Sequence, residues 1–217
     1  MKVELLDFFG GDIMAANVAR VSYAKEASQY TEEQNIKLIN YLVKHKHSSV
    51  FRHSQLQFRI RCSIYVERQL FKHSVGISTN SISGRYVDFS DSYSLIPLGE
   101  WRKQSKSSKQ GSDGFLGNDE QLLAFNIQDE IIKQCSTAYD NLIYLGVSKE
   151  QARSVLPLSL ETEFIWTGSM LAFVHMCNLR LKEDAQKETR DVVSNMLYLV
   201  KNNTDNKFFN TLQAFNL

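Results

Sequence analysis

The chain of 217 residues contains only two prolines, Pro97 and Pro157. Proline removes a backbone donor and clashes with the preceding helical turn, so a chain that nearly lacks it can form long uninterrupted helices. The proline-free segments are rich in leucine, lysine and glutamate, which favour helix. The sequence therefore predicts a mainly helical protein that is long enough to bury a sizeable core.

Hydrophobic periodicity predicts where these helices and a small sheet lie. Strands are expected at 2–9 and 55–61, where apolar and polar residues alternate, and a shorter one at 82–89. Helices are expected at 63–73, 119–145, 159–180 and 183–202, and one over 36–43 after a capping box formed by Thr31 and Gln34. No internal repeat or linker divides the chain, so residues 1–217 are predicted to form a single domain.

Composition argues against several classes of protein. The formal net charge is +1, which gives no overall field that would attract nucleic acid or an anionic membrane. No apolar run reaches membrane-spanning length, and the first residues lack the apolar core of a signal peptide. The cysteines Cys62, Cys135 and Cys177 are widely spaced and form no CxxC pair, as in proteins with reduced thiols. We therefore expect a cytoplasmic protein without a nucleic-acid or membrane partner.

A polar segment at about 90–120 carries a basic run from Arg102 to Lys109. The run could be a solvated loop or a patch that binds nucleic acid. It lacks the interleaved aromatic side chains on which bases stack, which favours the solvated loop.

Two histidines, His47 and His53, flank Ser49 and Phe51 just ahead of the expected strand at 55–61. They could line the edge of a cofactor, bind a metal, or satisfy backbone groups in a polar loop. Since no third ligand lies at suitable spacing, the metal alternative is weak, and no metal site is expected.

The stretch from Arg68 to Tyr86 has the composition of an anion-binding loop. On the expected helix, Gln69, Lys72 and His73 share one face. A second group of residues, Ser83, Gly84 and Arg85, offers a hydroxyl, an approachable backbone amide and a guanidinium suited to phosphate. Its spacing matches neither a Walker loop nor a dinucleotide fingerprint.

The C-terminal half places Arg153 before Pro157, and Arg180 after an apolar helical run that also contains His175. An arginine that follows so apolar a run is expected to be half-buried, where it must be paired or hydrogen-bonded. Arg180 could be a functional group, or it could form a structural ion pair with Glu183 or Glu188.

Together these segments resemble the flavin-dependent thymidylate synthases. That family's signature, Arg-His-Arg followed by Ser, Asn-Glu, Ser and Arg-Tyr, corresponds here to residues 72–86, with the loop one residue longer. The flanking family elements correspond to His47–Ser49–Phe51–His53, to 152–157, and to the stretch from Asn178 through Arg180 to Glu188. The departures are Lys72 and Ser74 in place of two arginines, Ser81 in place of glutamate, Arg52 in place of an acidic residue, and Leu171 in place of an arginine.

The resemblance implies an α+β fold, with helices around a small antiparallel sheet, and a homotetramer with shared active sites. It also implies that dUMP is methylated to dTMP with methylenetetrahydrofolate as carbon donor and FAD, reduced by NADPH, as hydride source. The departures leave an alternative, a non-catalytic homologue that binds dUMP and flavin.

The resemblance also assigns roles to individual residues. Arg180 would be catalytic, by stabilising negative charge on the pyrimidine. The dUMP-binding residues would be Gln69, Lys72, Ser81, Ile82, Ser83, Gly84, Arg85, Arg153 and Arg180. The FAD-binding residues would be Ser49, Lys72, His73, Ser74, Val75, Ser81, Ser169 and His175, with His47 at the face where folate or nicotinamide stacks. Ser83 has no base beside it in sequence, so it is assigned to phosphate rather than to nucleophilic catalysis.

Overall fold

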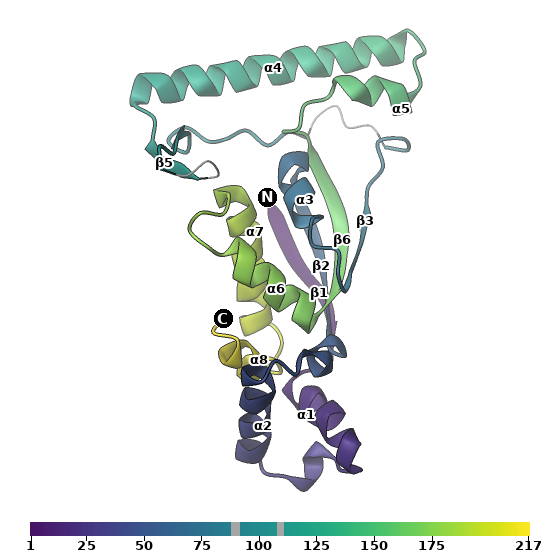
Figure 1. The fold of residues 1–217 in the computed structure, drawn as a ribbon. Coiled ribbons are helices and arrows are strands. Elements are labelled where there is room, and N and C mark those ends of the chain that lie inside the picture. The colour runs from purple at the N-terminus through teal and green to yellow at the C-terminus, as the bar shows by residue number, and fades with distance from the viewer. Residues whose placement is uncertain (88–91, 108–110) are drawn as a thin grey trace.

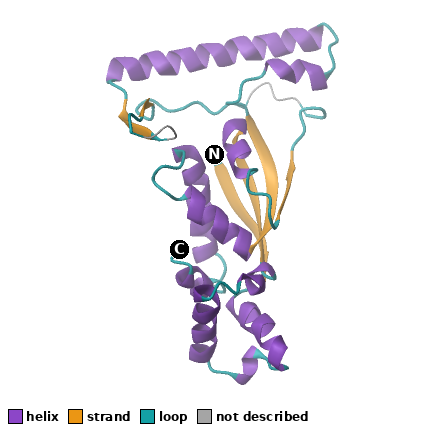
Figure 2. Cartoon of the chain, in the orientation of Figure 1, coloured by secondary structure: helices purple, strands orange, loops and turns teal. Residues whose placement is uncertain are grey.

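The computed structural model describes residues 1–87, 92–107 and 111–217. Its centre is a four-stranded antiparallel sheet with the strand order β1-β2-β6-β3 (Figure 1). The strands are β1 (Lys2–Phe9), β2 (Gln55–Ser63), β6 (Glu161–Ser169) and β3 (Ile77–Ser81). The predicted fold class, a helix-rich α+β arrangement around a small antiparallel sheet, is confirmed, as are the strands predicted at 2–9 and 55–61 (Figure 2).

One face of the sheet carries the main core. Alternate residues of β2 (Leu56, Phe58, Ile60) and of β6 (Phe164, Trp166) are at most 2% exposed. They pack with side chains of α3 (Ile64–Leu70), α6 (Met170–Arg180) and α7 (Lys187–Asn202) in one cluster. This packing places the C-terminal ends of α3 and α6 beside the start of α7, and the candidate site lies there (Figure 1).

A second, smaller core lies at the opposite end of the sheet from the candidate site. Here α1 (Asp12–Arg20), α2 (Glu32–Lys44) and α8 (Phe209–Ala214) meet the 3-10 helix η3 (Ser48–Arg52). The predicted capping box at the start of α2 is confirmed, since Thr31 Oγ1 accepts from the Gln34 amide at 3.3 Å and Gln34 Oε1 accepts from the Thr31 amide at 3.0 Å. Short 3-10 helices η1 (Val21–Tyr23) and η2 (Ala27–Gln29) connect α1 to α2.

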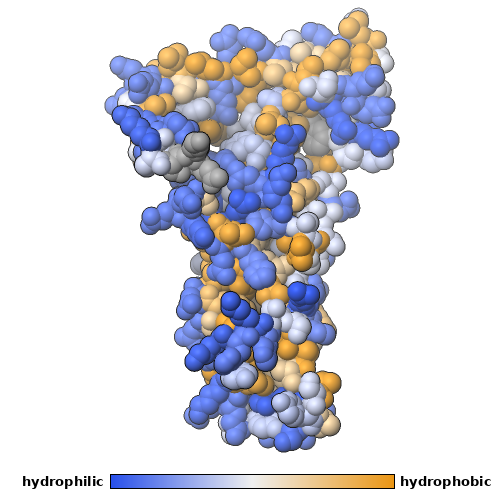
Figure 3. Space-filling model, in the orientation of Figure 1, coloured by the Kyte–Doolittle hydropathy of each residue, from blue (hydrophilic) through white to orange (hydrophobic). Residues whose placement is uncertain are grey.

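A long helix, α4 (Asn118–Tyr144), lies across the other end of the molecule, followed by α5 (Lys149–Ala152) and the 3-10 helix η4 (Arg153–Val155). Before it, β4 (Arg102–Gln104) and β5 (Ser112–Phe115) form a hairpin, here called the β4–β5 hairpin. Apolar side chains remain exposed along α4, as the space-filling view shows (Figure 3). No helix in the described part of the chain is both long and apolar enough to cross a membrane.

Two predicted elements are wrong. Residues 159–180 do not form one helix, because 161–169 are the strand β6, and its alternating buried positions merge into the equally apolar α6. The strand predicted at 82–89 is replaced by β3 at Ile77–Ser81, after which the chain turns through bonds from the amides of Tyr86 and Val87 to the Ser83 carbonyl. Positions 88 and 89 of that prediction lie outside the described residues.

The other predicted helices are confirmed as α2, α3, α4 and α7, with small shifts at their ends. Helix α7 begins at Lys187 rather than at 183 because the preceding residues form the turn out of α6.

Candidate active site

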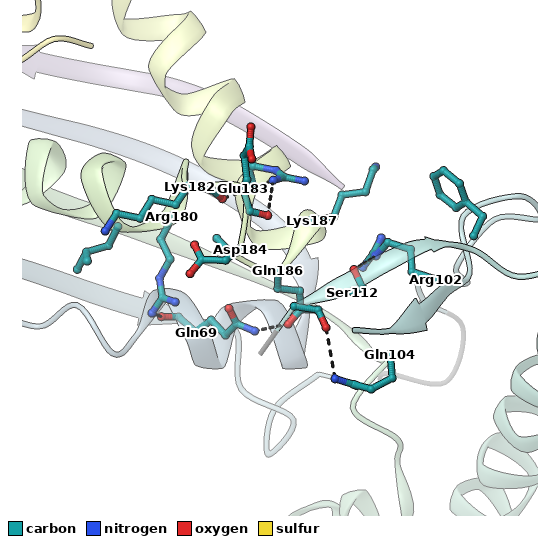
Figure 4. A pocket seen from close by; sticks show the side chains of 15 residues that line it. Gln69, Arg102, Gln104, Ser112, Arg180, Lys182, Glu183, Asp184, Gln186 and Lys187 are labelled. Carbon is teal, nitrogen blue, oxygen red and sulfur yellow. Dashed lines mark hydrogen bonds between the residues drawn. The ribbon is translucent and has the colours of Figure 1, made fainter. Parts of the chain in front are cut away.

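A pocket of about 1000 Å³ opens where α3, the end of α6, the start of α7 and the β4–β5 hairpin meet (Figure 4). Gln69 and Arg180, both predicted site residues, line it together. Residues of the turn between α6 and α7 and of the β4–β5 hairpin complete the wall. Part of the segment predicted to be a solvated loop therefore contributes to this pocket. It forms the β4–β5 hairpin, most of whose residues are exposed as predicted, whereas Arg102 is partly buried.

Arg180 is held at the end of α6 by two hydrogen bonds. Its Nε donates to His73 Nε2 at 2.9 Å, and its Nη2 donates to the Gln69 carbonyl at 3.1 Å. The alternative of an ion pair with Glu183 or Glu188 is wrong, because Glu188 is instead bound to Arg102. Arg180 thus projects a half-buried guanidinium with no carboxylate partner among the described residues.

His73 serves as the acceptor for Arg180 because its imidazole is neutral. Burial lowers the pKa of His73 below its ordinary value of 6.5, and the neighbouring Arg180 charge lowers it further. An imidazole that accepts at Nε2 carries its proton on Nδ1. The contact joins residues 107 positions apart, so only the tertiary fold brings them together.

A chain of polar side chains continues from Gln69 across the pocket wall. Gln69 Nε2 donates to Gln186 Oε1, and Gln69 Oε1 accepts from Thr189 Oγ1 at 3.1 Å. Gln186 Nε2 in turn donates to Glu188 Oε2 at 2.9 Å. Arg102 Nη2 donates to both oxygens of Glu188, at 2.8 and 3.1 Å.

The sequence reading missed Arg102 as a site residue. Its side chain is only 20% exposed, and its Nε donates to Ser112 Oγ at 3.0 Å. Burial alone would raise the pKa of Glu188, but bonds from Arg102 and Gln186 reverse this, so the pKa lies below its ordinary value. No local signal distinguishes this arginine from its basic neighbours, because its partner lies 86 positions away.

The predicted phosphate-binding residues form a separate group beside α5. Arg85 Nε lies 3.7 Å from Glu150 Oε2, and Arg153 Nε donates to the Glu150 carbonyl at 3.3 Å. Ser83 Oγ accepts from the Arg85 amide at 3.3 Å, and Gly84 is buried. These residues do not line the pocket that contains Arg180.

A third group surrounds a small cavity of about 190 Å³ at the start of α6. Val75, Ser169 and His175 line it, together with Leu171, which stands at one of the departures from the signature. Gly76 has φ +73°, and a Cβ there would lie 3.0 Å from Ser169 Oγ, so only glycine fits between loop and helix cap. The lining combines the polar Ser169 and His175 with the apolar Leu171 and Ala172, which suits contact with one edge of a flavin ring, although the cavity is far too small for the whole dinucleotide.

The remaining predicted residues lie at the surface between or beyond these groups. Lys72, Ser74, Ser49 and His47 are exposed, and the His47 ring lies 6.0 Å from that of Tyr41. Ile82 is 42% exposed, with its amide bonded to the Glu163 carbonyl at 2.9 Å.

Ser81 binds a carboxylate that the sequence reading also missed. Its hydroxyl donates to Glu67 Oε1 at 2.8 Å. Burial raises the pKa of Glu67 above its ordinary value, and the Ser81 bond only partly offsets this. Glu67 lies two residues before Gln69 on α3, and this closeness to a predicted site residue was the only sequence signal that could have identified it.

Other reactive groups offer little chemistry. Burial raises the pKa of Cys62 and of Cys177 to about 12, so both thiols stay protonated. Within the described ranges, no group of three or more histidine, cysteine, aspartate and glutamate side chains is placed to hold a metal ion.

Comparison with known proteins decides the family. The model of the thymidylate synthase complementing protein family matches residues 4–204. A flavin-dependent thymidylate synthase from Kosmotoga olearia is 38% identical over 186 residues, which cover 86% of this chain and 79% of the relative. The chain belongs to the flavin-dependent thymidylate synthase family. A synthase of the same name from Thermus thermophilus is 36% identical over 199 residues, covering 92% of this chain and 71% of the relative.

Solved structures agree with this assignment. A UMP/dUMP methylase from Streptomyces cacaoi, solved with 5-Br dUMP bound, superposes with a TM-score of 0.88 at 25% identity, covering 99% of this chain and 94% of that chain. As a member of this family of methyltransferases, the protein is an enzyme.

Proposed function

We propose that this enzyme makes dTMP from dUMP by reductive methylation, with methylenetetrahydrofolate as the carbon donor. The family and the nucleotide carried by the Streptomyces structure support this substrate. When bound, FAD reduced by NADPH supplies the hydride that completes the methyl group. We also propose that the enzyme acts in the cytoplasm, because its three free cysteines suit a reducing compartment.

The observation that carries the proposal is the Arg180 guanidinium, held by His73 and the Gln69 carbonyl at the wall of a large pocket. C5 of uracil becomes a nucleophile when negative charge on the ring at N3 and O2 raises the electron density at C5. A fixed cation beside N3 and O2 stabilises this activated form of the ring. Because the acceptors that the described residues offer to Arg180 are neutral, its charge remains available to the substrate.

Gln69 would bind the nucleotide beside Arg180, and Ser83, Gly84, Arg85 and Arg153 would bind its phosphate. A hydroxyl, a buried glycine and two guanidiniums suit a phosphate better than any neutral group. Ser81 and Ile82 would lie alongside, and Lys72 would reach both substrate and cofactor.

The flavin would contact Ser49, Lys72, His73, Ser74, Val75, Ser81, Ser169 and His175, with His47 at the face where folate or nicotinamide stacks. Ser169 caps α6 by accepting from the Ala172 amide at 3.2 Å, which fixes the rim of the small cavity. These residues would orient the ring and exclude water from it.

We further propose that the single domain assembles into a homotetramer whose active sites are shared. The three groups of predicted residues are separate within one chain, as expected if a second copy completes each site. The exposed apolar side chains of α4 also need a partner: Leu123, Ile127 and Ile131 recur at four-residue spacing and are 62%, 56% and 48% exposed. Light scattering on the purified protein tests the mass, and a monomer at micromolar concentration would contradict this assembly.

The experiment on function measures release of tritium from C5 of labelled dUMP, with NADPH, methylenetetrahydrofolate and saturating FAD. We expect release together with dTMP formation and a flavin absorbance band. dUMP binding without release would support the non-catalytic homologue, the alternative that the departures at Lys72, Ser74 and Ser81 leave open. Absence of both flavin binding and release would refute the proposal.

A further inference from the structure

The amide of Gln69 can be placed in two ways, with its oxygen and nitrogen exchanged, and the two present opposite hydrogen-bonding groups to a ligand. In the observed placement Gln69 Nε2 donates to Gln186, and Oε1 accepts from Thr189. The opposite placement would also be satisfied by Thr189 alone, because a hydroxyl both donates and accepts. The choice must therefore come from the Gln186 side of the network.

The orientation of the Gln69 amide depends on the Arg102–Glu188 ion pair, which lies outside the predicted site. Arg102 has only donors, and the ionised Glu188 has only acceptors, so Glu188 must receive hydrogens from every neighbour. Gln186 must therefore donate from its NH₂ group to Glu188, which leaves its side-chain oxygen to accept from Gln69. Gln69 must then donate through Nε2, which leaves one amide hydrogen and one oxygen lone pair for a ligand.

We propose that the Arg102–Glu188 ion pair is a positioning element for the nucleotide, acting through Gln186 to set the amide orientation of Gln69. The inference rests on the proposed function in one respect, that Gln69 binds dUMP. It makes the β4–β5 hairpin a functional part of the site, because Arg102 is fixed there by Ser112.

The decisive variant is Glu188→Gln, which keeps the shape and removes the charge. The new amide can accept from Arg102 through its oxygen and donate to Gln186 through its nitrogen. The side-chain amides of Gln186 and Gln69 then exchange their oxygen and nitrogen positions, and Thr189 Oγ1 accepts from Gln69 Nε2. Arg102 keeps its 2.8 Å bond but loses the 3.1 Å bond and its counter-charge, so the melting temperature is expected to fall, as it also should in the matched control described below. The affinity for dUMP, measured by titration calorimetry, is expected to fall about tenfold, as for one well-oriented hydrogen bond.

Glu161→Gln is the matched control. Glu161 is also an arginine-paired carboxylate, 2.8 Å from Arg61 and 16% exposed, against 18% for Glu188. It lies at the start of β6, away from the pocket. This variant is expected to bind dUMP as wild type does.

A second variant, Arg102→Gln, tests the role of the cation. Glu188 remains ionised at neutral pH and still orients Gln186, so dUMP affinity changes little there. The charged or titratable groups that the described residues place against Glu188 are Arg102 on β4 and Tyr65 on α3. Without Arg102, its hydrogen bond and its charge no longer lower the pKa of Glu188, so that pKa rises relative to wild type and the affinity is expected to fall at a higher pH.

The outcomes distinguish the proposed positioning role of the Arg102–Glu188 ion pair, here called the relay, from the proposed function of the enzyme. If wild type fails to bind dUMP, the proposed function is refuted, and with it this role for the ion pair. If wild type binds and Glu188→Gln binds equally well, the relay alone is refuted. If Glu161→Gln lost dUMP affinity as strongly as Glu188→Gln, the proposal would also be refuted, since a general loss of stability would then explain both variants.

Discussion

The sharpest test of the mechanism is Arg180→Ala. The substitution removes the cation proposed to stabilise charge on the pyrimidine, and loss of one such group lowers kcat by about 10²–10³-fold, or roughly 3–4 kcal/mol. The fold loses the bonds from Arg180 to His73 and to the Gln69 carbonyl. At about 1 kcal/mol for each bond, stability should fall by roughly 2 kcal/mol, which a protein of this size tolerates.

The assay combines three measurements on each variant: tritium release from C5 of dUMP, flavin absorbance, and thermal unfolding. Arg180→Ala should lose turnover while it keeps bound flavin and a cooperative transition. Arg180→Lys, which keeps the charge but not the two-directional bonding, should fall between wild type and alanine. Arg59→Ala on the solvent-facing side of β2 is the control, because Arg59 is 48% exposed and, among the described residues, forms its ion pairs with Glu4 and Glu163.

Two results would refute the reasoning about Arg180. If Arg180→Ala retained more than about a tenth of wild-type kcat, the guanidinium would not stabilise the transition state to the extent expected of such a group. If both Arg180 variants unfolded at 25 °C, the role of the residue would be structural.

Three further predictions follow from the geometry. Gly168→Ala would put a methyl group 2.5 Å from the buried Trp166 ring, so the melting temperature should fall by roughly 2–10 °C in calorimetry. Because the pKa of His73 is lowered on folding, the unfolded chain takes up its proton first, and stability should fall as pH drops below 6.5; His73→Gln should flatten that part of the melting curve against pH. Ser81→Glu would set a second carboxylate against Glu67 and should destabilise the fold by roughly 1–3 kcal/mol in urea unfolding, an effect that Glu67→Ala in the same chain should relieve.

Local pattern was sufficient for most elements of the fold. The alternation in β1 and β2 and the capping box of α2 are short-range signals, and the structure follows them. Local pattern was not sufficient at β6, because the apolar residues of this strand are followed directly by the apolar residues of the buried helix α6. The break between them is the cap at Ser169, a polar residue that a continuous apolar run conceals.

The site divides in the same way. Gln69 and Arg180 were predicted because each lies in a recognisable family element, and the fold brings them together across 111 positions. Arg102 was missed because its neighbours in sequence are solvated lysines and serines, and only the partner supplied by α7 makes it different. Residues that act through such long-range pairs leave no local pattern to read.

The change at Ser81 leaves a carboxylate beside the altered position of the signature. The family signature has glutamate at this position, and serine alone would leave that part of the site without a carboxylate. The structure supplies one from Glu67 on α3, bonded to the Ser81 hydroxyl at 2.8 Å. Since burial raises the pKa of this carboxyl, a second acid at 81 would be unfavourable, and serine is the better neighbour because it donates. The departure is therefore compensated within the chain, which favours an active enzyme over a homologue that only binds.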